Sequence, residues 1–130
     1  MAEPTIIAYV TDDMTIAKVV IFGPVMSIFK SKTIDEVDPA LRHWFMILQV
    51  IDRANASSYG LGAGVVTQNL QTSLRFTREW RGSTVYVNCF AIFNAAAPFG
   101  GFKNLGVGRE LGEHALRPYL ENKTVVIIKE

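Results

Sequence analysis

The chain has 130 residues, of which 49% are hydrophobic and 19% are charged, and its formal net charge is +1. This length allows one domain with a single core and excludes a cofactor domain joined to a substrate domain of ordinary size. No run of five or six like charges occurs, so we expect neither nucleic acid nor an anionic membrane as a partner. The apolar excess suits a chain that buries surface against something else, because soluble proteins carry roughly 25% charged residues.

A single cysteine and two histidines limit the redox and metal chemistry. Cys89 has no second cysteine to pair with, and no Cys/His spacing of the zinc kind occurs, so we expect no disulfide and no metal. No export signal is readable, and the longest apolar run, Trp44–Ile51, is far shorter than the roughly 20 residues that cross a bilayer. We expect a cytoplasmic chain, with a mitochondrial location left open for a full-length parent.

Short β-branched runs alternate with helix-like stretches, which is typical of an α/β fold with helices against a sheet. In the first part of the chain we expect strands at Ile6–Val10, Val19–Phe22 and Val25–Phe29. Thr33 and Glu36 form a capping box that predicts the start of a helix.

The segment that follows interrupts this alternation. Asp38 and Pro39 look like a second N-cap and first-turn proline, so either the helix breaks there or two helices abut. Trp44–Leu48 is then apolar at every position, without an amphipathic period. Such a run must be buried, because an exposed apolar run promotes aggregation.

The second half of the chain returns to regular alternation. Leu61–Thr67 and Thr84–Val87 are predicted strands, and Asn69 is the predicted cap of a helix between them. After a glycine-rich loop, we expect a helix over Glu110–Leu120 and a final strand at Thr124–Ile128.

Eight short strings occur in a fixed order along nearly the whole chain. They are Val10-Thr11-Asp12-Asp13-Met14, Ile21-Phe22-Gly23-Pro24-Val25, Thr33-Ile34-Asp35-Glu36-Val37, Arg53-Ala54-Asn55, Ser58-Tyr59-Gly60-Leu61, Val85-Tyr86-Val87-Asn88, Pro98-Phe99-Gly100-Gly101-Phe102-Lys103 and Gly108-Arg109-Glu110-Leu111-Gly112-Glu113. In this order they resemble the C-terminal portion of the aldehyde dehydrogenase superfamily, particularly its cytosolic and mitochondrial tetrameric members.

The resemblance implies one partial catalytic domain over residues 1–130, with a mostly parallel sheet flanked by helices and an oligomerisation strand at residues 123–130. It also implies oxidation of an aldehyde to a carboxylic acid with NAD or NADP, through a covalent adduct on a cysteine. In the family, the nucleophilic cysteine, the base glutamate and the cofactor domain precede this portion. We therefore expect a truncated or fragmentary member with no catalytic residue of its own, inactive by itself.

The resemblance also assigns individual residues. Phe22 matches a phenylalanine beside the nicotinamide ribose, although an apolar residue in a predicted buried strand is more often core. Two residues earlier the family has a glutamate that accepts ribose hydrogen bonds, and this chain has Val20. Losing such an acceptor costs about 1.5–3 kcal/mol, so cofactor use is in doubt.

Phe93 and Phe99 match aromatic positions of the aldehyde tunnel, and core packing explains them equally well. Cys89 matches a structural position, where we expect an ordinary buried cysteine.

Arg109 and Glu121 stand at positions that the family uses for charged contacts near the subunit interface. A helix between them could bring the two charges together, although two solvated charges worth less than about 1 kcal/mol are the favoured alternative for a lone chain. In the family, the terminal strand augments a neighbouring subunit's sheet. The expected partner is therefore a second copy or a full-length homologue. An enzyme fragment that needs an upstream half, a non-catalytic interaction module and an unstable chain all remain open.

Relative to the family pattern, Asp38–Val50 is an insertion of thirteen residues. At about 100° per residue it rotates the helix by roughly 220°. We expect the insertion either to loop out, exposing Trp44–Leu48, or to cover a surface that the family leaves bare. A retained non-coding segment or a faulty gene model explains it equally well.

Overall fold

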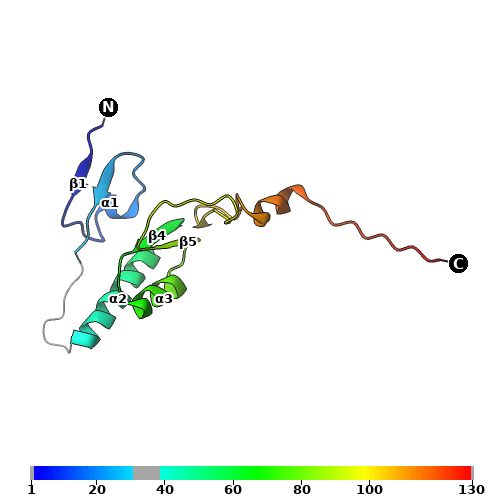
Figure 1. The fold of residues 1–130 in the computed structure, drawn as a ribbon. Helices are drawn as coiled ribbons and strands as arrows, with labels where there is room; N and C mark the ends of the chain where they lie inside the picture. The colour runs from blue at the N-terminus through cyan, green and yellow to red at the C-terminus, as the bar shows by residue number, and fades with distance from the viewer. Residues whose placement is uncertain (1, 31–38, 130) are drawn as a thin grey trace. The chain divides into compact units, whose positions relative to one another are not determined.

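The computed structural model describes residues 2–30 and 39–129, with side chains from residue 46 onward in the second stretch. The chain forms two compact units, one made of Met1–Ser58 and Asn69–Trp80 and the other of Tyr59–Gln68 and Arg81–Glu130. Figure 1 shows the order of the elements along the chain. The predicted capping box of Thr33 and Glu36 lies outside the described residues.

The first unit contains a parallel pair of short strands. β1 (Thr5–Ile7) pairs with β2 (Val25–Ser27). Beyond β1, Val10 is 4% exposed and its amide donates to the Ile28 carbonyl at 3.1 Å, so the two segments stay together past the strands. The predicted strands here are confirmed, with shorter bounds.

A single helical turn, α1 (Thr15–Lys18), separates these strands. The strand predicted at Val19–Phe22 is wrong: the Val19 amide closes the helical turn on the Thr15 carbonyl, and the Gly23 amide closes a tight turn on the Ile21 carbonyl. These local bonds replace the cross-strand bonds that a strand needs.

Helix α2 (Pro39–Ala56) is an uninterrupted α-helix of 18 residues. It begins at Pro39, where the fixed φ of proline suits the first helical position. The alternative that residues 38–50 loop out is wrong for the described part of that segment, because residues 39–50 belong to this helix. Ile51 is 2% exposed and anchors the helix, while Met46, Ile47 and Leu48 are half-buried.

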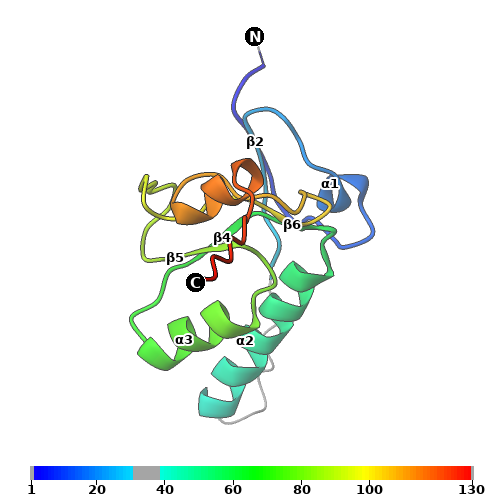
Figure 2. The same cartoon turned by 90° about the vertical axis from the view of Figure 1, so that its right-hand side faces the viewer.

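Helix α3 (Leu70–Glu79) packs alongside α2, as Figure 2 shows. The predicted cap is confirmed, because the Asn69 side chain accepts a hydrogen bond from the Thr72 amide at 3.0 Å. The Asn55 side-chain amide donates to the Glu79 carbonyl at 2.8 Å, and Phe76 is buried. The C-terminal turns of the two helices are thereby joined.

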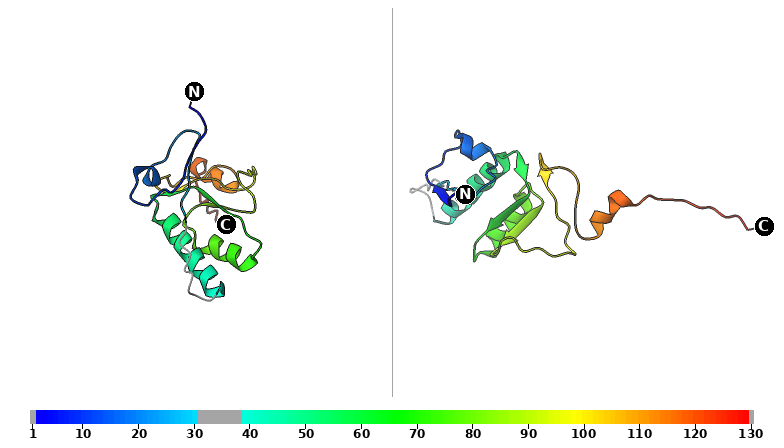
Figure 3. Two further views of the ribbon diagram at one scale, coloured as in Figure 1. Left: turned by 90° about the vertical axis from the view of Figure 1, so that its left-hand side faces the viewer. Right: turned by 90° about the horizontal axis from the view of Figure 1, so that it is seen from above.

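The second unit is built on another parallel pair, β4 (Gly62–Val65) and β5 (Thr84–Val87). Figure 3 shows these strands side by side. Strand β5 has the predicted bounds, and its Tyr86 is buried. A short antiparallel pair joins β3 (Tyr59–Gly60) to β6 (Phe102–Lys103). The α/β class is confirmed, although the described strands form three separate two-stranded sheets.

The C-terminal part departs most from expectation. The α-helix predicted over Glu110–Leu120 is wrong: η1 (Glu113–Tyr119) is a 3-10 helix that contains Pro118. The helix cannot begin at Glu110, because the Glu110 backbone is already paired with Phe99. Residues 120–129 form no strand, since no described segment pairs with them. None of the described helices is long and apolar enough to span a membrane.

Candidate functional site

A loop in the second unit carries most of the predicted site residues, and Asn88 starts it. Asn88 has φ of 54°, a left-handed conformation that asparagine tolerates better than most residues. Its side chain accepts a hydrogen bond from the Thr67 amide at 2.8 Å and donates to the Thr67 carbonyl at 2.9 Å. The segment after β4 is thus joined to the end of β5.

The next two residues, Cys89 and Phe90, differ in their surroundings. Cys89 is exposed, so the expectation of a buried cysteine is wrong. Phe90 instead packs at the strand end, with its ring 5.2 Å from the Tyr86 ring. A Cβ on Gly64 would lie 3.1 Å from the Phe90 ring, so this ring takes the space beside β4 and leaves the thiol facing solvent.

Phe93 and Phe99 lie together as an aromatic pair. Their ring centroids are 5.4 Å apart with an interplanar angle of 74°, the edge-to-face arrangement that aromatic rings favour. Phe93 remains 63% exposed, so it is not a core residue of the described chain. The pair presents an apolar surface against which a ligand of apolar character can be desolvated.

Backbone pairing closes the loop behind this aromatic pair. The Phe99 amide donates to the Glu110 carbonyl at 2.7 Å and the Glu110 amide donates back at 2.6 Å. The Gly112 amide donates to the Ala95 carbonyl at 2.9 Å. A Cβ on Gly100 would overlap the Gly108 carbonyl oxygen, so the two sides of the loop approach as closely as glycine allows.

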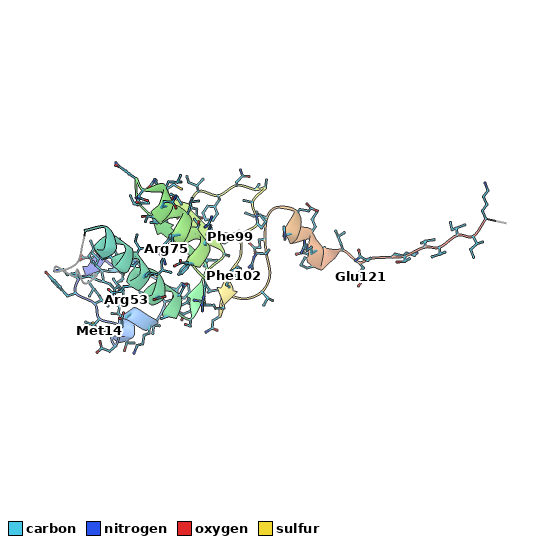
Figure 4. All side chains as sticks on the ribbon, turned by 90° about the horizontal axis from the view of Figure 1, so that it is seen from below. Met14, Arg53, Arg75, Phe99, Phe102 and Glu121 are labelled. Atoms are coloured by element: carbon cyan, nitrogen blue, oxygen red, sulfur yellow. The ribbon has the colours of Figure 1, made fainter. Side chains whose placement is uncertain are left out.

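Arg109 acts within this loop. Its Nη1 donates to the Gly101 carbonyl at 3.0 Å and to the Gly108 carbonyl at 2.7 Å, and its guanidinium lies 4.8 Å from the centroid of the Phe102 ring. No described ion pair joins Arg109 to Glu121, so the two charges do not meet within the chain. Figure 4 labels Phe99 and Phe102 on the loop and Glu121 on the extended segment after η1. A role for either charge at a subunit interface stays a prediction.

Phe22, the predicted cofactor contact, belongs to the first unit. Its side chain is 99% exposed, so the alternative that it is a core residue is wrong for the described chain. Val20 is 40% exposed on the same turn. Both side chains are therefore open to a ligand, and neither offers a hydrogen-bonding group.

The sequence interpretation missed an ion pair in the first unit. Arg53 Nη2 lies 2.8 Å from Asp12 Oδ1, and the guanidinium lies 4.9 Å from the centroid of the Phe29 ring. Both charges line a cleft of about 670 Å³, to which Gln49 of the predicted insertion contributes. Asp12 and Arg53 belong to two of the eight strings, but a separation of 41 residues carries no sequence signal of contact.

The first unit also contains a local carboxylate interaction, at Asp13. The Thr11 hydroxyl donates to this carboxylate and, with a smaller contribution from the backbone and Lys18, holds the pKa of Asp13 below its ordinary value. No group of three or more His, Cys, Asp or Glu residues able to hold a metal ion occurs in residues 2–30 and 39–129.

Comparison with known sequences shows the family to which the chain belongs. Residues 1–125 match the sequence profile of the aldehyde dehydrogenase family. The mitochondrial benzaldehyde dehydrogenase of Antirrhinum majus is 52% identical over 124 residues, which are 95% of this chain and 21% of that protein. Aldehyde dehydrogenase 1A1 of Gallus gallus is 50% identical over 125 residues, which are 96% of this chain and 22% of that protein.

Solved structures similar to this chain are also aldehyde dehydrogenases. The NAD+ complex of an aldehyde dehydrogenase from Bacillus cereus is 46% identical and superposes with a TM-score of 0.82, over 98% of this chain and 23% of that one. An apo betaine aldehyde dehydrogenase from Staphylococcus aureus is 33% identical, with a TM-score of 0.80 over 93% of this chain and 22% of that one. The chain thus spans about a fifth of the length of its relatives.

Proposed function

Since the chain belongs to the aldehyde dehydrogenase family, we propose that its 130 residues supply the C-terminal part of an NAD(P)-dependent aldehyde-oxidising domain. The observation that carries this proposal is the edge-to-face pair of Phe93 and Phe99 at 5.4 Å. These rings offer an apolar wall for the aldehyde's hydrocarbon part. Desolvation against such a wall favours apolar aldehydes over polar ones.

We further propose that these residues do not oxidise aldehydes by themselves. Covalent aldehyde oxidation needs an activated thiolate, a general base and oxyanion donors around one reacting carbon. Cys89 is the only thiol of the chain, and it has no hydrogen-bond partner among the described residues. The nucleophile and base are then supplied by an upstream portion, within one polypeptide or in a complex.

The cofactor contact is proposed to be weak. Phe22 is open to solvent and can lie against a nicotinamide ribose, but Val20 has no acceptor for ribose hydroxyls. A charge-assisted hydrogen bond contributes about 1.5–3 kcal/mol, which corresponds to about one to two powers of ten in affinity. NAD and NADP are both compatible with these two side chains.

A hybrid enzyme tests these roles. The 130 residues replace the matching part of Gallus gallus aldehyde dehydrogenase 1A1, and NAD(P)H formation is measured with acetaldehyde and with benzaldehyde. Phe99→Ala is expected to raise the KM for benzaldehyde by about tenfold and to change that for acetaldehyde less, because only the larger aldehyde loses a ring contact. Val20→Glu is expected to lower the KM for NAD by about tenfold or more.

Phe90→Ala is the matched control in the same hybrid, because Phe90 is 68% exposed and contacts Tyr86 instead of the aromatic pair. Its KM for either aldehyde is expected to stay within about twofold of the parent hybrid. Equal effects of Phe99→Ala on both aldehydes would refute the aldehyde contact.

A second candidate function is a non-catalytic module that pairs with full-length homologues. The feature that favours it is the extended segment after η1, where Val126, Ile127 and Ile128 are 81%, 85% and 87% exposed. A β-branched segment with free backbone groups can add to a sheet edge of another chain.

Deleting residues 122–130 is expected to reduce association with a full-length homologue by about tenfold or more, because the strand pairing and its apolar contacts are lost together. Light scattering or pull-down measures the association. Glu121→Lys tests the predicted interface charge in the same assay, with Glu113→Lys as a control at an exposed position in η1. Equal association of the deletion variant and the wild type would remove the main support for the module.

A further inference from the structure

Arg109 is placed to determine where the aromatic pair lies. It precedes Glu110, whose backbone is paired with Phe99 by two hydrogen bonds of 2.7 and 2.6 Å. Its Nη1 reaches across the loop to the Gly101 carbonyl, two residues after Phe99, at 3.0 Å. One side chain therefore joins both sides of the loop next to the residue that contacts Phe93.

The type of side chain matters at this position. A guanidinium presents several donors in a plane, so one face can lie over an aromatic ring while an edge binds carbonyl oxygens. Arg109 does both, with its guanidinium 4.8 Å from the Phe102 ring centroid and with Nη1 shared between two carbonyls. An ammonium group also has several donors, but it has no planar face to lie over the ring while an edge binds the carbonyls.

The surroundings leave the loop dependent on this contact. Gly100 approaches the Gly108 carbonyl too closely for any side chain, so no packing side chain can hold the two sides together there. The neighbouring residues Leu105 and Val107 are 39% and 99% exposed and contribute little apolar burial. Besides the backbone pairing of Phe99 with Glu110, the hydrogen bonds and the ring contact of Arg109 are what join the two sides of the loop.

We propose that Arg109 is a positioning residue, which fixes the Phe99 ring against Phe93 by clamping the loop between Phe99 and Glu110 within its own chain. This inference rests on the proposed function only for the meaning of the aromatic pair as an aldehyde contact. The clamp itself differs from the interface role that the family resemblance suggests for the same residue.

NMR on the whole 130-residue chain tests the clamp without any enzymatic assay. In Arg109→Ala, the amides of Phe99 and Glu110 are expected to exchange about tenfold faster, because the loop loses the charged hydrogen bonds that join its two sides. The nuclear Overhauser contacts between the Phe93 and Phe99 rings are expected to vanish. Amides of β5, such as Val85 and Val87, should keep their protection.

Arg117→Ala, in η1, is the control and should leave the ring contacts and both exchange rates unchanged. Should Arg109→Ala also unfold β5, Arg109→Lys decides the matter, because it keeps the charge and a single donor nitrogen but not the planar guanidinium. We expect it to preserve β5 and still accelerate exchange of Phe99 and Glu110 by about threefold. Unchanged ring contacts and exchange in Arg109→Lys, or in a folded Arg109→Ala, would overturn the proposal. Failure of the hybrid enzyme would leave these readouts untouched.

Discussion

Replacing Ile51 with alanine is expected to destabilise the first unit by about 2–5 kcal/mol. Ile51 is 2% exposed, the most deeply buried large side chain of the described residues, and it lies in α2 directly after the inserted residues. Truncation removes its apolar contacts and leaves a cavity that the surrounding helices and strands can fill only in part.

Urea denaturation followed by tryptophan fluorescence measures this loss, since both tryptophans, Trp44 and Trp80, belong to the first unit. Val50→Ala is the matched control on the same turn of α2. Val50 is 44% exposed, so its truncation is expected to cost less than about 1 kcal/mol. Equal losses in the two variants would show that α2 is not docked through Ile51.

The second large effect is expected at Gly100. An alanine there would place Cβ against the Gly108 carbonyl oxygen and 3.0 Å from Cδ of Arg109, so the loop must open. We expect a cost of about 1–3 kcal/mol, confined to the second unit. Hydrogen exchange of the Phe99 and Glu110 amides reports the opening directly.

Gly108→Ala is the matched control for this prediction, because a Cβ at Gly108 meets no atom within 4 Å. Its exchange rates should stay within about twofold of the wild type. If Gly100→Ala behaved like Gly108→Ala, the close approach of the two sides of the loop would be contradicted.

Local sequence signals predicted those elements that are stabilised locally. The Asn69 cap, the strand Thr84–Val87 and the first-turn position of Pro39 each depend on a few neighbouring residues, and the structure has all three. The strand predicted at Val19–Phe22 failed because its apolar composition carries no information about a pairing partner. Turn bonds within α1 and at Gly23 use the same backbone groups instead.

The candidate site was predictable only in part for the same reason. The resemblance identified Phe93 and Phe99 as belonging to one site, and the structure brings their rings together. The pairing of Phe99 with Glu110 and the contact of Arg109 with Gly101 join positions 11 and 8 residues apart, across a loop without a regular period. Such contacts leave no periodic pattern from which they can be predicted.

The rotation that residues 38–50 were expected to impose on the helix depends on which end of the helix is held in place. A rotation of roughly 220° would turn the buried face outward only if the helix were held at its N-terminal end. The helix is instead held at its C-terminal end, through burial of Ile51, the ion pair of Arg53 with Asp12 and the hydrogen bond from Asn55 to Glu79. From these contacts, residues 39–50 continue α2 along its axis toward its N-terminal end.

The proposal that these residues need an upstream portion for catalysis is tested most directly by assaying the purified 130-residue chain alone. NAD(P)H formation is measured with NAD, with NADP and with benzaldehyde, in the wild type and in Cys89→Ala. We predict no turnover above the Cys89→Ala background, because the only thiol of the chain lies exposed and has no hydrogen-bond partner among the described residues that would activate it. Turnover by the wild type that disappears in Cys89→Ala would contradict the account, since it would make Cys89 the nucleophile of a self-sufficient enzyme.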